Sequence, residues 1–339
     1  MRAKPTAIDK AERLREFAAY KEQYYSKPTD EFLPIDQLDA HDPQSVAEFA
    51  GEVQRHMQNT EWRNHAQQNC IQAQRDLTSK MRMILISWLV EVHMKFKLLP
   101  ETLFLTINIL DRYTMFKPNI KRGDYQLVAV SAMLIACKYE EIYAPEIRDF
   151  IFMTDKAYTK EQMLVTESDI LRTLNFNFTQ PSSYRFLERY AKLGQCDDLI
   201  VNFARFVLEL SFMNTTLYKW RPSQIAASAI FIAKKILKRP QPWSPFMIQQ
   251  TGVDDRMVRA CSKDLCLVVN VANSQPEYQS IMRKFSLPRF MEVSKICASV
   301  ATTHASSQDP NTSSANTSQT TTASTQPKTS NSTPQDDRC

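Results

Sequence analysis

Glycine is scarce in this chain, with four among 339 residues, at positions 51, 123, 194 and 252. So few glycines exclude the glycine-rich loops that cradle phosphates, and they are typical of helices joined by short turns. The sequence also lacks any run of about 18 apolar residues, so it predicts no membrane-spanning helix. The N-terminus carries no apolar segment with a small-residue cleavage site, and we therefore expect an intracellular protein.

The residue patterns that most chemistry requires are missing as well. The formal net charge of +5 is mild and argues only weakly for nucleic acid as a partner. The seven cysteines include no Cys-x-x-Cys pair, which indicates reduced thiols. The five histidines lack the spacing of a metal site, and no nucleophile elbow, phosphate loop or kinase motif set is present. We expect no catalytic residue, metal or cofactor, and binding is the favoured class of function.

Helical periodicity and helix-start signals divide most of the chain into two sets of five helices. Proline, aspartate, serine or threonine stands at most of the predicted starts. The first set is predicted at 80–97, 101–116, 124–139, a short helix from Pro145, and 159–174 with a capping box of Thr159 and Gln162. The second is predicted at 182–194, 198–214, 222–238, 245–251 and 254–272. The fold class is therefore all-α, with two stacked five-helix domains.

A short internal repeat supports this division. The segment Ser131-Ala-Met-Leu-Ile-Ala-Cys-Lys138 returns as Ser228-Ala-Ile-Phe-Ile-Ala-Lys-Lys235, on the third helix of each set. Small residues on these two helices let neighbouring helices approach closely, as a central helix requires.

The flanking regions differ from the two sets. Residues 1–41 are charged and broken by prolines, which predicts a flexible arm, and 297–339 form a Ser/Thr-rich tail that we expect to be disordered. Asp42-Pro43 opens a predicted helix that runs to about Thr60. Its apolar stripe predicts an accessory helix docked on another element, and it consists of Val46, Phe49, Val53 and Met57.

The segment from Met81 to His93 is apolar around nearly its whole circumference, which is typical of a central helix. Arg82 and Glu91 interrupt it, and each charge requires a partner or solvent. Two apolar faces on one helix are consistent with a core on one side and a docking surface on the other.

These motifs resemble the cyclin box. The matching segments stand in the family's order and spacing, and they are Met81–His93, Leu110–Tyr113, Ala136–Ile142, Pro145–Ile147, Tyr158–Lys160, Glu167 and Leu174–Phe178. The resemblance covers roughly residues 42–296, and its end, Tyr278–Ser286 with Arg289-Phe290, is most similar to the mitotic B-type group. It implies an N-terminal helix and linker at 42–78, followed by two tandem five-helix cyclin-box repeats at 79–178 and 179–296.

The resemblance also implies a function. A cyclin of this group binds and activates a cyclin-dependent kinase, helps to recruit its substrates, and controls the cell cycle at the G2/M transition, in nucleus and cytoplasm. Such a partner does no chemistry itself, because it only needs greater affinity for the active state of the kinase. The positions that match the family's kinase-binding residues are Lys138, Glu167, Tyr139, Leu171, Phe176, Phe178, Phe49 and Val53.

Two further groups of residues match the family's pattern. A substrate-docking surface for Arg-x-Leu-type substrate or inhibitor peptides is implied at Met81, Ile84, Leu85, Trp88, Glu91 and Gln126. One position departs from the pattern, since Ser87 stands where the family usually has Asp. Arg82 and Asp111 match an ion pair, which we interpret as structural because a stranded buried charge is costly.

Other interpretations stay open. Lys138 and Glu167 are consistent with a simple surface pair, while the aromatic and docking positions are consistent with core packing. A cyclin-fold module of the transcription machinery is the alternative function, although the weak charge excess disfavours direct contact with nucleic acid. An all-α enzyme would need a convergent set of catalytic groups. Because residues 1–40 contain no Arg-x-x-Leu destruction signal, we also predict slow or atypical turnover, or an N-terminal arm that extends beyond this sequence.

Overall fold

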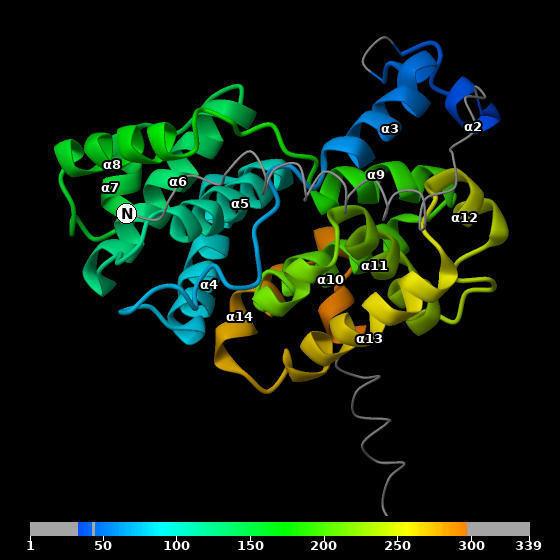
Figure 1. Cartoon of the computed structure of the whole chain (residues 1–339). Coiled ribbons are helices and arrows are strands. Elements are labelled where there is room, and N and C mark those ends of the chain that lie inside the picture. The colour runs from blue at the N-terminus through cyan, green and yellow to red at the C-terminus, as the bar shows by residue number, and fades with distance from the viewer. Residues whose placement is uncertain (1–32, 43–44, 297–339) are drawn as a thin grey trace, which may run out of the picture.

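The computed structural model describes residues 33–42 and 45–296, and every regular element in that part of the chain is a helix. Helices α4 to α8 form one group and α9 to α13 a second, and the two groups lie side by side (Figure 1). None of the helices described is long and apolar enough to cross a membrane. The predictions for residues 1–32 and for the tail at 297–339 lie outside the described residues.

The first group is built around its third helix. Its members are α4 (Ser79–Phe96), α5 (Pro100–Phe116), α6 (Tyr125–Glu140), α7 (Ile147–Met153) and α8 (Lys160–Thr173). Helix α6 is buried along most of its length and contacts the other four. At the start of α8 the predicted capping box is confirmed, because the side chains of Thr159 and Gln162 each accept a hydrogen bond from the other's backbone N–H.

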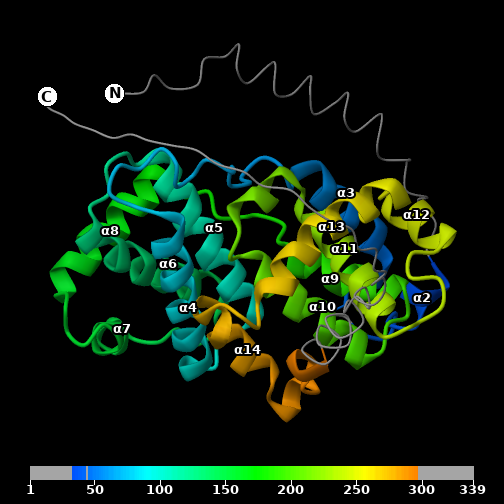
Figure 2. The ribbon, with the colours of Figure 1, turned by 90° about the horizontal axis from the view of Figure 1, so that it is seen from below.

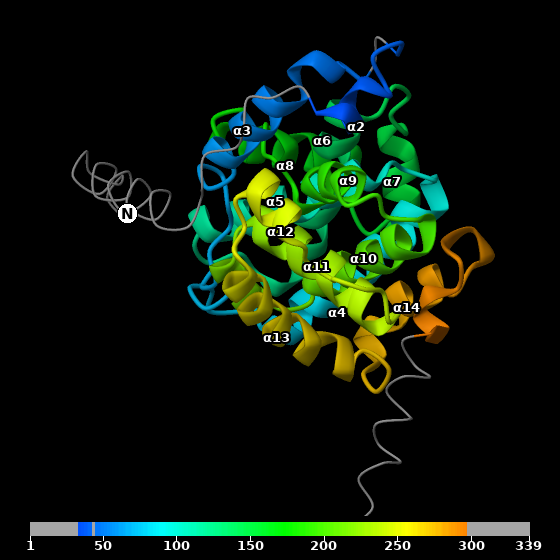
Figure 3. The same ribbon diagram turned by 90° about the vertical axis from the view of Figure 1, so that its right-hand side faces the viewer.

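The second group repeats this arrangement. Its members are α9 (Ser183–Leu193), α10 (Asp198–Ser211), α11 (Pro222–Ile236), α12 (Pro245–Thr251) and α13 (Asp255–Val271). Helix α11 lies in the middle, with α9, α10 and α13 as its main neighbours, while α12 packs chiefly on α9 (Figure 3). The repeated segments therefore occupy equivalent central helices, and their serines and alanines are buried.

The chain returns to the first group after α13, which was not predicted. A 3-10 turn (Pro276–Tyr278) leads into α14 (Gln279–Phe285), and a second turn follows (Pro288–Phe290). Helix α14 packs on both α4 and α10, so it joins the two groups (Figure 2). A buried ion pair supports this contact, with Lys284 Nζ 2.6 Å from Glu209 Oε1.

Residues 33–42 correct the prediction of a flexible arm up to residue 41. They contain the short helix α2 (Pro34–Gln37), and Leu33 is buried. Asp36 accepts hydrogen bonds from two guanidinium nitrogens of Arg189 on α9, at 2.5 and 2.9 Å. Burial opposes the ionised form of Asp36, but Arg189 and Lys192 outweigh it and lower the pKa of its carboxyl. Sequence periodicity missed this segment because its attachment is ionic.

The N-terminal helix docks, but not through its apolar stripe. A 3-10 turn (Ala47–Phe49) precedes α3 (Ala50–Thr60), so the α-helix begins later than predicted. Val46, Phe49 and Val53 are about half exposed, whereas Gln54 and Gln58 are buried.

The reason lies in the C-terminal turn of α12. Its last carbonyls have no partner within the helix, and two glutamines of α3 supply one. Gln54 Nε2 donates to the carbonyl of Gln250, and Gln58 Nε2 donates to that of Thr251, both at 2.6 Å. Arg189 Nε also donates to Gln54 Oε1 at 2.9 Å. A polar face is thus buried, and Val46, Phe49 and Val53 are left outward, whereas Met57 of the same stripe packs partly against the core.

Replacing both Gln54 and Gln58 with alanine is expected to lower the free energy of unfolding by about 1–3 kcal/mol, because buried carbonyls lose their donors. Amide hydrogen exchange in α3 should accelerate in the same variant. The matched control is Val53→Ser on the outward face, which we expect to leave both measurements nearly unchanged. Equal effects of the two variants would show that the stripe, not the glutamines, holds α3.

Candidate functional site

The charged pair predicted for kinase binding forms in the free chain. Lys138, in the last turn of α6, places its Nζ 2.7 Å from Glu167 Oε1 on α8. The lysine side chain is 52% exposed and the glutamate side chain only 11%. The two partners therefore differ in exposure. The carboxylate of Glu167 is mostly buried on α8, whereas the side chain of Lys138 stays accessible to a binding partner.

Exposed aromatic side chains also lie at the ends of α6 and α8. Tyr139 is half exposed, and its hydroxyl lies 2.7 Å from Thr179 Oγ1. Phe176 is 67% exposed and has a φ of 54°, a left-handed conformation that a bulky residue rarely adopts. Leu171, one helical turn from Glu167, is partly buried against the core. The ends of α6 and α8 thus carry accessible aromatic rings as well as an accessible ammonium group.

Phe178 is a correction to the predicted contact set, because it is buried. Its ring lies edge-on to that of Tyr139 with centroids 6.3 Å apart, so the buried Phe178 packs against the half-exposed Tyr139. Two side chains that the sequence analysis missed fix the segment around it. Arg112 Nη1 donates to the carbonyl of Asn177 at 2.8 Å, and Asn64 Nδ2 donates to Asn177 Oδ1 at 2.9 Å.

Two further exposed residues were also missed. Ile142 and Tyr143 follow the end of α6, and they are 89% and 91% exposed. Together with Lys138, Tyr139 and Phe176 they form what we call the α6–α8 surface. A sequence signal was present for Ile142, which is the last residue of the family motif, whereas Tyr143 lies just beyond it; exposure itself is a tertiary property.

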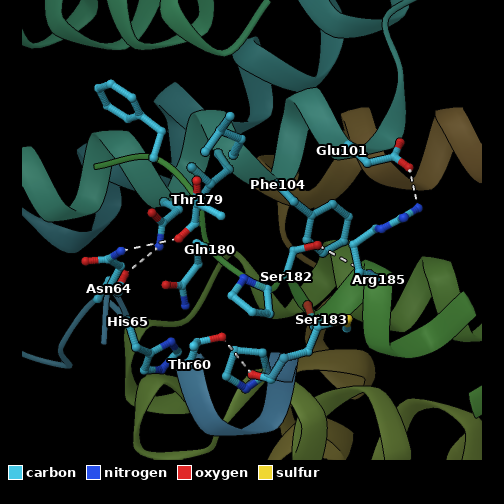
Figure 4. A pocket seen from close by; sticks show the side chains of 18 of the residues that line it. Thr60, Asn64, His65, Glu101, Phe104, Thr179, Gln180, Ser182, Ser183 and Arg185 are labelled. Carbon is cyan, nitrogen blue, oxygen red and sulfur yellow. Dashed lines mark hydrogen bonds and ion pairs between the residues drawn. The ribbon is translucent and has the colours of Figure 1, made fainter. Parts of the chain in front are cut away.

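A cavity of about 600 Å³ connects this surface to the N-terminal helix. Three of its sides are α3, the end of α6, and the segment between the two repeats (Figure 4). Its rim includes the Glu101–Arg185 ion pair, with the nearest atoms 3.5 Å apart. Burial, together with the nearby Glu101, raises the pKa of Glu140 at the same rim. Tyr139 of the α6–α8 surface and the last turns of α3, through His56, Met57 and Thr60, thus border one hollow.

The predicted docking residues, five on α4 and Gln126 on α6, lie in three different environments. Ile84 is exposed, while Met81, Trp88 and Gln126 are partly exposed. Leu85 is a correction: it is buried in the core and offers almost no surface to a peptide. We define the α4 docking surface as Met81, Ile84, Trp88, Glu91 and Gln126.

Helix α14 lies along one edge of the α4 docking surface. Glu91 forms an ion pair with Arg283 of α14, and Ser87 Oγ lies 2.8 Å from Ser280 Oγ. Sequence periodicity gave no signal for either contact, because the partners are almost 200 residues apart in the chain.

Arg82 and Asp111 form a buried ion pair, with Arg82 Nε and Nη2 each 2.7 Å from a carboxylate oxygen. Arg82 also donates to the carbonyl of Phe212 and to the hydroxyl of Tyr218, and both acceptors belong to the second group of helices. The pair therefore joins α4 to α5 and also ties the two groups together. Among the residues described, no three His, Cys, Asp or Glu side chains are grouped so as to hold a metal ion.

Comparisons with known proteins agree with this architecture. The cyclin N-terminal domain matches residues 52–179 and the cyclin C-terminal domain matches residues 181–299. The chain is 38% identical over 269 residues to a G2/mitotic-specific cyclin-B of Marthasterias glacialis, which covers 79% of this chain and 69% of that protein. It is 36% identical over 264 residues to cyclin-B2-4 of Arabidopsis thaliana, covering 78% of this chain but only 61% of that protein.

Solved structures show the same fold at low sequence identity. A viral cyclin from herpesvirus saimiri matches with a TM-score of 0.52 at 17% identity, over 58% of this chain and 89% of that one. A chain of the yeast RNA polymerase II CTD kinase complex CTDK-1 also matches with a TM-score of 0.52, at 15% identity, over 65% and 79%. From the two domain matches and the B-type relatives, the chain belongs to the cyclin family.

Proposed function

We propose that this protein binds and activates a cyclin-dependent kinase, and that it acts at the G2/M transition. The observation that carries the proposal is the α6–α8 surface, where an ion-paired lysine stands among exposed aromatic side chains in a member of the cyclin family. Relatives named G2/mitotic-specific cyclin-B support the timing. The chain does no chemistry of its own under this proposal, and its place in nucleus and cytoplasm stays a prediction.

The mechanism follows from differential affinity. A cyclin-dependent kinase is inactive while its regulatory helix, which carries the glutamate of the catalytic Lys–Glu pair, is turned away. A partner that binds the inward position more tightly shifts the kinase to the active state. Lys138 supplies charged hydrogen-bond donors for carbonyl groups at a helix end, and Phe176, Tyr139 and Ile142 supply apolar area. The exposed Phe49 and Val53 supply further apolar area on the N-terminal helix.

The test is a kinase activation assay with the whole chain. Lys138→Ala and Glu167→Ala are each expected to weaken kinase binding about tenfold or more, as loss of a charge-assisted hydrogen bond implies. The matched control is Lys117→Ala, which breaks the exposed pair with Asp169, also 2.7 Å long and also on α8. Full activation by the Lys138→Ala/Glu167→Ala double variant would exclude the α6–α8 surface as the kinase site.

We also propose that the α4 docking surface binds substrate or inhibitor peptides through an apolar side chain. The exposed Ile84 and the partly exposed Trp88 provide the apolar area. A peptide held there raises the local concentration of its phosphorylation site at the kinase.

A further inference from the structure

The α4 docking surface has one charged member, Glu91, and this carboxylate is already paired. Arg283 Nη2 of α14 donates to Glu91 Oε1, and Arg283 Nε also donates to the carbonyl of Gln279 at 3.3 Å. Both charged side chains remain accessible, with 69% of Arg283 and 50% of Glu91 exposed. A peptide that docks here therefore meets a guanidinium group of this protein beside the only carboxylate of the surface.

No second carboxylate stands at the position where the family usually has one. Ser87 takes the place of that Asp, and its hydroxyl is engaged with the buried hydroxyl of Ser280 on α14. Further along the same edge, Lys80 and Glu277 form another ion pair, 3.4 Å long. Each of these two ion pairs joins one positive and one negative charge, so both carboxylates, Glu91 and Glu277, already have a cationic partner.

We propose that this surface selects docking segments by their apolar side chain and not by an arginine, and that Arg283 sets this preference. The preferred partner carries an uncharged or acidic residue where Arg-x-Leu peptides carry arginine. The inference rests on the proposed docking function of the surface and names its partner class.

The physical basis of this preference is competition for Glu91 between two guanidinium groups, that of Arg283 and that of a peptide arginine. A peptide arginine reaches Glu91 either by displacing Arg283 or by lying next to it. Displacement replaces one exposed guanidinium–carboxylate pair with another, and close approach brings two positive charges together. An acidic peptide residue meets the exposed guanidinium of Arg283 instead, which is an attractive contact.

The experiment measures the affinity of the whole protein for three peptides by titration calorimetry. The peptides are identical except that they carry Arg-x-Leu, Ala-x-Leu or Glu-x-Leu. For the natural protein we expect the Arg and Ala peptides to bind within about twofold of each other and the Glu peptide to bind at least as tightly, since exposed ion pairs contribute little. In Arg283→Gln the free Glu91 should restore a preference of about two- to fivefold for the Arg peptide over the Ala peptide.

A second variant and a control complete the design. Ser87→Asp combined with Arg283→Gln adds a carboxylate and should increase the preference for the Arg peptide further. Trp88→Ala should weaken the binding of all three peptides equally, which would show that they bind at the α4 docking surface. A tenfold preference of the natural protein for the Arg peptide would overturn the role of Arg283 while leaving docking intact. Failure to bind any peptide would refute both docking and its specificity, whereas kinase activation through Lys138 is measured separately.

Discussion

Replacing Arg82 with alanine is expected to lower the free energy of unfolding by about 3–5 kcal/mol, the cost of leaving a buried charge without its partner. Arg82 and Asp111 are almost completely buried, and Arg82 fills four hydrogen bonds with Asp111, Phe212 and Tyr218. Its loss strands the carboxylate of Asp111 with the Tyr218 hydroxyl as a remaining donor. Because Phe212 and Tyr218 lie in the second repeat, the variant should also weaken the contact between repeats.

Urea unfolding followed by circular dichroism measures this effect. The control is Arg259→Ala, which removes a surface ion pair of similar length to Asp255 and should change the midpoint little. Replacing the whole pair, as Arg82→Met/Asp111→Leu, should recover part of the loss because no unpaired charge remains. A loss below about 1 kcal/mol in Arg82→Ala would show that water reaches Asp111 and that the pair is not truly desolvated.

Acidification is expected to destabilise the protein through His93, by roughly 4 kcal/mol between pH 6.5 and 3.5. Burial, and next the nearby Lys284, lower the pKa of His93 from 6.5 to about 3. The positive charges of Arg205 and Arg289 act in the same direction. Its Nε2–H donates to the carbonyl of Leu99 at 3.0 Å in the neutral form.

The direction of this pH effect follows from the difference in proton binding between the unfolded and folded states. Below pH 6.5 the unfolded chain protonates His93, whereas the folded protein does not until the pH approaches 3, so the unfolded state is stabilised relative to the folded state over that window. We expect His93→Gln, which retains a donor for Leu99, to become more stable relative to the natural protein as the pH falls from 6.5. The free energy of unfolding of both proteins, measured at intervals of pH, checks this because other groups cancel in the difference. Parallel curves would mean that His93 titrates normally in the folded protein.

Much of the helical framework follows from local signals. The capping box of Thr159 and Gln162, and prolines at the first turn of several helices, act over a few residues, so their effect is readable without knowledge of the fold. The pairing of Arg82 with Asp111 was also predicted, but from the resemblance to the cyclin box, since residue type and spacing alone required only that Arg82 have a partner or reach solvent. The two central helices are recognisable from their small residues, because this signal also lies within a short segment of the sequence.

The errors have a common cause, which is that exposure depends on contacts distant in the sequence. Phe49 and Val53 were placed on a docked face, but the open carbonyls of α12 bind Gln54 and Gln58 instead. Leu85 and Phe178 were assigned to binding surfaces and are buried. Apolar periodicity identifies a face, and it does not tell whether this chain or a partner covers it.

The helix from Ser79 to Phe96 shows which features follow from the sequence and which depend on the tertiary structure. Its sequence by itself determined that it is helical and central and that Arg82 needs a partner or solvent, because helix formation and the cost of burying a charge are governed by residue type and spacing. Only the tertiary structure decided what Glu91 and Ser87 face. Helix α14 brings Arg283 and Ser280 to them across almost 200 residues, and ionic and hydroxyl contacts of this kind leave no periodic trace in a sequence.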